Sequence, residues 1–403
     1  MSPPLRRNRD FVLLLSGRLL STLGSQVTAI AYPLLVLALT HSPAKAGIAG
    51  FAGLVPHAAL GLFAGVAADR WNRKRLMIAA DGVRVLAIAA LATLILLDRI
   101  AFWQIVAAAL VEGTGAVVFN TAHAGALRSV VPARQLPDAV GAMRARAAAV
   151  SLAGPPLGGV LFALGRAVPF VFDAVSYGFS FLTLVLMRTP FQEAREVDTA
   201  PLRTQIAEGF RFLWARPFLR TCAFLYGLGN FTLPAVLLVI VVAAQRQGLS
   251  SAGIGALLAA FGACTLIGAL ASPLFRRALS IRMILLLELW TGLGIVAFLV
   301  EPNVYVLTAA FMIQGVTLPV TDSVVEGYRI AVTPDRLLGR VETARSTISL
   351  LAAPLGPLVA GFLLAASSAR ATIAFVAAFT LALAVWGTLS PSIRNAPSLA
   401  DLG

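Results

Sequence analysis

The feature that most constrains this chain is the recurrence of apolar runs of about 20 residues along nearly its whole length. A helical run of this length crosses the hydrocarbon core of a bilayer. Lipid offers no hydrogen bonds to an open backbone, so such segments must be helical. The alternating apolar and polar pattern of a membrane β-barrel is missing from the sequence. The sequence therefore predicts an all-α polytopic membrane protein.

The apolar windows, divided at polar and Gly/Pro-rich breaks, predict about twelve transmembrane helices. In the first half of the chain we expect them at residues 11–39, 46–68, 76–97, 102–124, 141–164 and 168–187. In the second half we expect them at residues 218–243, 252–275, 283–300, 303–324, 343–365 and 371–389.

Composition agrees with a membrane protein and argues against a soluble one. Hydrophobic residues make up 59% of the chain and charged residues only 12%, whereas soluble domains carry about 25% charged residues. A net charge of +14 is typical of nucleic-acid binders, but here the bases lie in short connections between apolar runs. We therefore expect the lipid bilayer, and not a nucleic acid, as the partner. Cys222 and Cys264 lie in apolar runs and suggest no disulfide or metal site.

The placement of basic residues predicts the orientation of the chain. The first apolar run continues to Leu39, which is too long for the core of a signal peptide and indicates an uncleaved first helix. Alternating the sides of the predicted helices gathers most Arg and Lys residues on the side of the N-terminus. The positive-inside rule makes that side cytoplasmic. We expect a multi-pass protein of a bacterial-type cell membrane with both termini in the cytoplasm.

The two halves of the chain repeat each other at a shift of about 200 residues. The stretch "EGTGAVVFN" at 112–120 aligns with "QGVTLPVTD" at 314–322. Residues 188–217 form the longest polar segment and separate the halves, and their C-terminal part resembles an amphipathic interfacial helix. The sequence predicts a six-helix bundle at 1–187, a cytoplasmic linker at 188–217 and a second, pseudo-symmetric six-helix bundle at 218–403. Parallel repeats of this kind are typical of transporters that bind substrate between their halves.

The hairpin "GVAADRWNRKR" at 65–75 concentrates charge between two apolar runs. It resembles the signature of the major facilitator superfamily, Gly-x-x-x-Asp-Arg-x-x-Arg-Lys/Arg. The matching residues are Gly65, Asp69, Arg70, Arg73 and Lys74. The resemblance implies a latch that closes the cytoplasmic side and breaks when that side opens. The alternative is a basic stop signal for topology, which would need neither the glycine nor the aspartate.

The stretch "AGPPLGG" at 153–159 is similar to the antiporter motif of the superfamily's exporters, Gly-Pro-x-x-Gly-Gly. Its matching residues, which we name the antiporter motif here, are Gly154, Pro155, Gly158 and Gly159. The resemblance implies that they seal the contact between the two halves. The alternative is a generic Gly/Pro kink, because both residues are common in membrane helices.

Two further stretches, 170–181 and 333–341, look like the drug:proton antiporter subgroup that contains macrolide-efflux and enterobactin-exporter types. The chain departs from many of these relatives at "TLGSQ", residues 22–26, where Ser25 occupies a position that often carries an acid. This departure argues against proton coupling through the first helix.

Ionisable residues within the predicted helices are the candidates for coupling, since each costs several kcal/mol to insert in a membrane. Glu112 lies near the middle of its predicted helix with no basic residue one turn away, so it either binds a proton or hydrogen-bonds another helix. Asp81 and Asp322 are further candidates for proton coupling. Glu288 and Asp173 are weaker candidates.

Four other polar residues are candidates for lining a cavity or gating it, namely Arg18, Arg84, Asn120 and Gln314. Arg84 lies three residues after Asp81 and could pair with it locally. Arg18 could reach the membrane edge, meet Asp81 or bind a substrate carboxylate. Gln314 is the repeat mate of Glu112 and cannot titrate, so the two halves would be chemically unequal. His123 is read as a packing histidine more readily than as a proton relay.

The sequence predicts a secondary active transporter that exports small amphipathic drugs or secreted metabolites in exchange for protons. It carries no Walker-type nucleotide loop, no acyl-transfer triad and no cofactor or metal motif, so we expect neither an enzyme nor a bound cofactor. We expect the transporter to act as a monomer. The alternatives are a siderophore, metabolite or lipid transporter of the same fold with different coupling, or a membrane scaffold or sensor that transports nothing.

Overall fold

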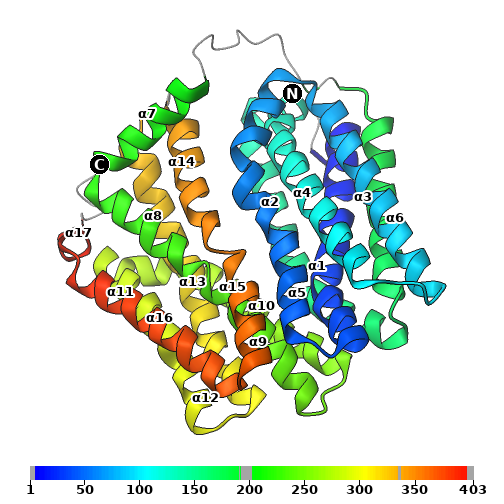
Figure 1. Ribbon diagram of the computed structural model, residues 1–403. Coiled ribbons are helices and arrows are strands. Elements are labelled where there is room, and N and C mark those ends of the chain that lie inside the picture. Colours follow the sequence, from blue (N-terminus) through cyan, green and yellow to red (C-terminus); the bar gives the residue numbers. More distant parts are fainter. Residues whose placement is uncertain (1–4, 190, 192–201, 335–336, 397–403) are drawn as a thin grey trace. The chain divides into compact units, whose positions relative to one another are not determined.

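The computed structural model describes residues 5–189, 191, 202–334 and 337–396 (Figure 1). It describes the backbone alone at residues 6, 62, 65–70, 124, 128, 133, 137, 144, 202 and 205. Every regular element in these ranges is a helix. Among the described residues 11 helical segments are long and apolar enough to cross a membrane, and α2 (Pro43–Arg70) adds a helix of 28 residues at the predicted span 46–68. The predicted all-α membrane fold is confirmed.

The chain folds into two compact units. Unit 1 comprises the described residues of 1–41, 48–199 and 250–259, and unit 2 comprises those of 42–47, 200–249 and 260–403. Besides α2, the helices of the first half are η1 (Leu5–Arg7), α1 (Arg9–Thr40), α3 (Arg73–Leu96), α4 (Phe102–Val130), η2 (Ala133–Gln135), α5 (Leu136–Leu164) and α6 (Val168–Leu186). Within unit 1, α1 packs against both α5 and α6, while α3 packs against α4 and α6.

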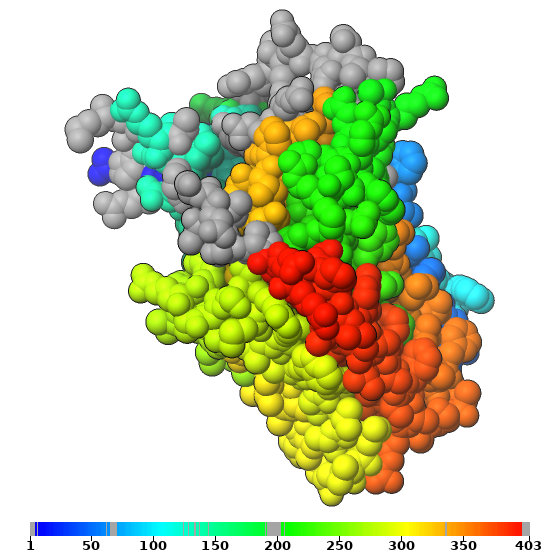
Figure 2. All heavy atoms as spheres, turned by 90° about the vertical axis from the view of Figure 1, so that its left-hand side faces the viewer, coloured from blue at the N-terminus to red at the C-terminus, as the bar shows by residue number. Residues whose placement is uncertain are grey.

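The helices of the second half are more fragmented. They are α7 (Leu202–Trp214), α8 (Pro217–Gly229), α9 (Thr232–Arg246), α10 (Ser251–Ala278), α11 (Ile281–Thr291), η3 (Gly292–Val296), α12 (Ala297–Val300), α13 (Val304–Val332), α14 (Leu338–Leu351), α15 (Leu355–Ala366), α16 (Ala369–Leu389) and α17 (Pro391–Arg394). In unit 2, α7 packs against α14, and α16 with α17 lies against α8 and α11, as Figure 2 shows for the red and green segments.

Three of the helices predicted as continuous in the second half are interrupted, and one of them, the predicted span 283–300, is divided among α11, η3 and α12. The predicted span 218–243 is divided between α8 and α9, and the predicted span 343–365 is divided between α14 and α15. Pro354 has no backbone N–H to continue a helix, which explains the second interruption. At the first interruption, the side chain of Asn230 donates a hydrogen bond to the carbonyl of Ser349, at 2.7 Å. The two interruptions therefore stabilise each other, a contact that hydropathy alone does not reveal.

The glycines of the antiporter motif allow close helix contacts inside unit 1. A Cβ atom placed on Gly158 would lie 2.8 Å from the carbonyl oxygen of Val27 on α1. A Cβ atom on Gly159 would lie 2.3 Å from the carbonyl oxygen of Ser251 and 3.1 Å from the Cα of Gly255. Backbone atoms cannot move aside as a flexible side chain can, so these positions on α5 exclude larger residues.

Replacing Gly158 with alanine is expected to destabilise the protein by about 1–3 kcal/mol through overpacking. The matched control is Gly141→Ala on the same helix, because a Cβ atom there would meet no other atom within 4 Å. Thermal unfolding of the purified protein in detergent would measure both variants. We expect a lower unfolding midpoint for Gly158→Ala alone, and equal midpoints for both variants would contradict the packing argument.

Candidate functional site

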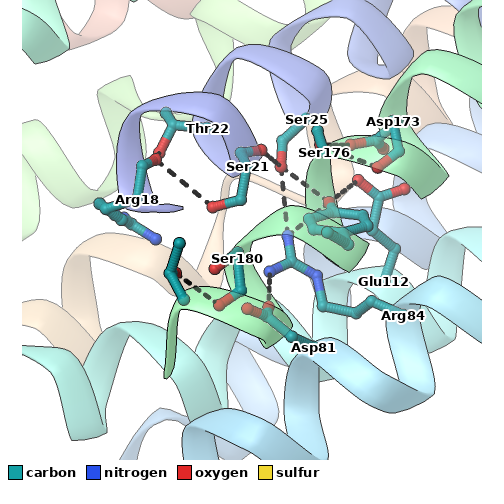
Figure 3. Close-up of polar contacts among 12 residues, drawn as sticks. Arg18, Ser21, Thr22, Ser25, Asp81, Arg84, Glu112, Asp173, Ser176 and Ser180 are labelled. Atoms are coloured by element: carbon teal, nitrogen blue, oxygen red, sulfur yellow. Dashed lines mark hydrogen bonds and ion pairs between the residues drawn. The ribbon is translucent and has the colours of Figure 1, made fainter. Parts of the chain in front are cut away.

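A buried polar cluster joins four helices of unit 1 (Figure 3). The residues contributed by α6 recur at helical spacing and therefore share one face, namely Asp173, Ser176, Tyr177 and Ser180. All four are at most 1% exposed. This polar face points toward α1, α3 and α4, as hydrogen bonds to those helices show.

The hydroxyl of Tyr177 is the centre of the cluster. It donates to Oε1 of Glu112 on α4, at 2.9 Å, and accepts from Nη2 of Arg84 on α3, at 2.5 Å. It also lies 2.7 Å from the hydroxyl oxygen of Ser25 on α1. The guanidinium carbon of Arg84 lies 3.7 Å from the centre of the Tyr177 ring, a cation–π contact. One side chain of α6 thus contacts each of the other three helices.

Glu112 is 9% exposed and accepts hydrogen bonds only from hydroxyl groups among the described residues. Its donors are Tyr177, Tyr32, at 2.8 Å, and Thr28, at 3.4 Å. The sequence left open whether Glu112 binds a proton or hydrogen-bonds another helix, and the structure turns it toward hydroxyl groups of α1 and α6. A carboxylate held by neutral donors in a dry interior can bind a proton without breaking an ion pair.

Asp173 lies close to Glu112 through a shared hydroxyl. The hydroxyl of Thr28, which is fully buried, is 2.9 Å from Oδ2 of Asp173 and 3.4 Å from Oε1 of Glu112. Oδ1 of Asp173 accepts a further hydrogen bond from Ser176, at 3.1 Å. Because Thr28 has a single hydroxyl proton, it cannot donate fully to both carboxylates at once.

Asp81 and Arg84 form an ion pair within α3, at 3.3 Å between Nη1 and Oδ1, as their spacing of three residues suggested. Asp81 is fully buried and Arg84 is 3% exposed. Arg84 also donates to the hydroxyl of Ser25 on α1, at 3.1 Å. Because Arg84 forms its ion pair with Asp81, neither Glu112 nor Asp173 has a direct ionic partner among the described side chains.

Of the other predicted coupling and cavity residues, Arg18 lies at the edge of this cluster (Figure 3), and Asn120, Asp322 and Gln314 are not part of it. Arg18 is half-buried on α1, with its guanidinium carbon 5.3 Å from the centre of the Phe119 ring. Asn120 on α4 is exposed. In unit 2, Asp322 is exposed, and the Oε1 atom of Gln314 has no hydrogen-bond partner among the described residues.

The structure describes only part of the predicted latch. The side chains of Gly65, Asp69 and Arg70 lie outside the described residues. The ammonium group of Lys74 donates to the carbonyl of Met187, at 2.6 Å, where α6 ends. A Cβ atom on Gly125 of α4 would lie 2.5 Å from the Arg73 guanidinium. Both basic side chains therefore contact neighbouring parts of unit 1. A stop signal for topology would need only basic residues exposed to solvent.

Sequence reasoning missed the hydroxyl groups that hold the cluster together. Thr28, Tyr32 and the hydroxyl of Tyr177 were not predicted as hydrogen-bond partners of the buried acids, although Tyr177 lies in the stretch 170–181, "FVFDAVSYGFSF". The signal was present in that stretch, because its polar residues recur every three or four positions in an otherwise apolar helix.

Sequence comparison identifies relatives over nearly the whole chain. A family model described as transmembrane secretion effector matches residues 2–399. The multidrug efflux pump Tap of Mycolicibacterium fortuitum is 28% identical over 400 residues, which cover 95% of this chain and 96% of that protein. The enterobactin exporter EntS of Escherichia coli is 27% identical over 351 residues, covering 84% of this chain and 81% of that protein.

Solved structures show the same fold. A bacterial homologue of the human lysosomal transporter Spinster superposes with a TM-score of 0.76 at 14% identity, covering 100% of this chain and 99% of that one. The nucleoside transporter NupG gives a TM-score of 0.71 at 12% identity, covering 96% of this chain and 100% of that one. These identities are low, and the likeness concerns the fold alone.

Replacing Tyr177 with phenylalanine is expected to destabilise unit 1 while leaving its ring contacts intact. The change removes the hydroxyl that Arg84, Glu112 and Ser25 share, and unsatisfied buried partners cost about 1–3 kcal/mol. Tyr305→Phe is the matched control, because Tyr305 is 57% exposed. Thermal unfolding in detergent should show a lower midpoint for Tyr177→Phe only. Equal midpoints for the two variants would contradict the central role of the Tyr177 hydroxyl.

Proposed function

Because the chain belongs to the transmembrane secretion effector family of the major facilitator superfamily, we propose that it exports small amphipathic molecules in exchange for protons. Its relatives Tap and EntS are named as a multidrug efflux pump and an enterobactin exporter. Both names describe efflux of small molecules, which supports export over import. The mechanism we propose is alternating access, in which the substrate site opens to one side of the membrane at a time.

The observation that carries the proposal is the pair of buried carboxyl groups, Glu112 and Asp173, on either side of the Thr28 hydroxyl. Two ionised carboxylates in a dry interior repel each other and lose hydration. A single bound proton removes one charge and supplies the missing donor to Thr28. The pair therefore has the chemistry of a site that holds one proton and releases it when its surroundings change.

Release of that proton would affect four helices at once. Ionised Glu112 would draw the hydroxyl proton of Tyr177 and the nearby charge of Arg84 more strongly, which alters contacts to α1, α3 and α6. In this proposal the latch residues Gly65, Asp69, Arg70, Arg73 and Lys74 respond by opening or closing the cytoplasmic side, and the antiporter motif limits leakage. The orientation with both termini in the cytoplasm and a functional monomer belong to the same proposal.

Replacing Glu112 with glutamine is expected to abolish proton-driven efflux, because the amide keeps the shape of the side chain and cannot titrate. Asp173→Asn should reduce proton-driven efflux at least tenfold by removing the second carboxyl group of the pair. Transport would be measured as uptake of a fluorescent substrate into everted vesicles, in which the cytoplasmic face of the exporter points outward, with and without a protonophore.

The matched control is Glu301→Gln, since Glu301 is exposed and lies between α12 and α13. It should transport as the unmodified protein does. Unchanged protonophore-sensitive efflux in Glu112→Gln and Asp173→Asn would refute the assignment of proton coupling to this pair.

A further inference from the structure

A second polar feature of unit 1 lies outside the carboxyl pair, in a cavity of about 370 Å³ between α1, α4 and α5. From its walls we infer that this cavity binds amphipathic organic anions, which would be the substrate class of the exporter. That the bound anion is a substrate rests on the proposed export function. That an anion binds here rests on the cavity alone.

The walls of the cavity are apolar over most of their area. Leu15 and Leu19 come from α1, Leu127 from α4, and Met143 and Val150 from α5. These aliphatic side chains can pack against the apolar part of a ligand of varied shape, because such contacts need no hydrogen bonds.

The charge of the cavity is uniformly positive. Arg18 and Arg146 line it, and none of the described residues that line it is acidic. Within the described part of the chain, neither guanidinium group forms an ion pair or a side-chain hydrogen bond, and the contact of Arg18 is with the ring of Phe119. Two guanidinium groups beside one apolar cavity attract an anion and repel a cation.

A third polar side chain faces the same space. His123 is 7% exposed and lines the cavity, and its Nε2 atom has no hydrogen-bond partner among the described residues. Its ring stacks on Phe119, with 6.0 Å between the centroids, which fixes its orientation. A buried polar nitrogen without a partner is costly unless something binds it. An anionic group between Arg18, Arg146 and His123 would satisfy all three side chains.

The charge of the site argues against binding of cationic amphiphiles. A cationic amphiphile would meet two guanidinium charges and no carboxylate, whereas a carboxylate or sulfonate accepts paired N–H bonds from arginine. The apolar walls would then cover the rest of the anion. The residue types thus predict selectivity for anions over neutral molecules of the same shape.

The test is binding to the purified full-length protein in nanodiscs, measured by isothermal titration calorimetry without a proton gradient. The probes are naphthalene-1-sulfonate and its neutral counterpart naphthalene-1-sulfonamide, which share the same apolar body. We expect the sulfonate to bind at least tenfold more tightly than the sulfonamide. Arg18→Gln and Arg146→Gln should each weaken sulfonate binding about tenfold or more, because each removes a charged hydrogen bond. Sulfonamide binding should not change.

Arg166→Gln is the matched control, since Arg166 is exposed and does not line the cavity; it should bind both probes as the unmodified protein does. Arg146 is exposed, so Arg146→Gln tests the inference even if Arg18→Gln fails to fold. Equal affinities for the two probes, or sulfonate affinity unchanged in Arg146→Gln, would overturn the inference. Glu112→Gln should still bind the sulfonate, so a loss of proton coupling and a failure of the anion site give different results.

Discussion

A charged group inside a membrane protein must find its partners within the protein, and in unit 1 one tyrosine hydroxyl meets much of this requirement. The Tyr177 hydroxyl accepts from Arg84 and donates to Glu112, so a cation and a carboxylate on different helices share a neutral intermediary. The arrangement avoids the cost of leaving either group unsatisfied in a dry interior. It also means that a change in the charge of Glu112 reaches Arg84 through one side chain.

Hydropathy predicts the helices of this chain well because the bilayer imposes a length and a requirement for internal hydrogen bonds. The first six helices agree with their predicted ranges to within a few residues, except that α4 and α5 extend further toward each other. The interruptions of the second half could not be predicted in this way. At the break after α8, Asn230 donates to the carbonyl of Ser349, and these two residues lie 119 positions apart in the chain.

The same division between local and distant contacts applies to the site. The pairing of Asp81 with Arg84 could be predicted because a spacing of three residues brings both side chains to one face of a helix. The partners of Glu112 could not, because Thr28 and Tyr177 come from α1 and α6 and their positions depend on how three helices pack. Sequence spacing identifies which residues share a face, and it leaves open which faces meet.

The internal repeat shows where the chemistry of the two halves diverges. The shift of 202 residues that relates Glu112 to Gln314 also relates Asp173 to Phe375 and Tyr177 to Phe379. In unit 2 those two phenylalanines pack around Phe231, with 6.5 Å and 4.9 Å between ring centroids. An aromatic cluster thus stands where unit 1 has its polar cluster. The proton site that we propose for unit 1 therefore has no counterpart at these positions of unit 2.

Helix α1 contacts both sites that we propose, the carboxyl pair of Glu112 and Asp173 and the anion-binding cavity. Arg18 lines the cavity, Ser25 contacts Tyr177 and Arg84 two turns later, and Thr28 lies between the two carboxyl groups. In the proposed mechanism α1 would transmit a displacement at one site to the other, because it carries contacts to both. Binding at either site would then change the free energy of binding at the other, and this effect would be reciprocal. Exchange of an anion for a proton needs such a coupling, and the order of residues on α1 provides a physical route for it.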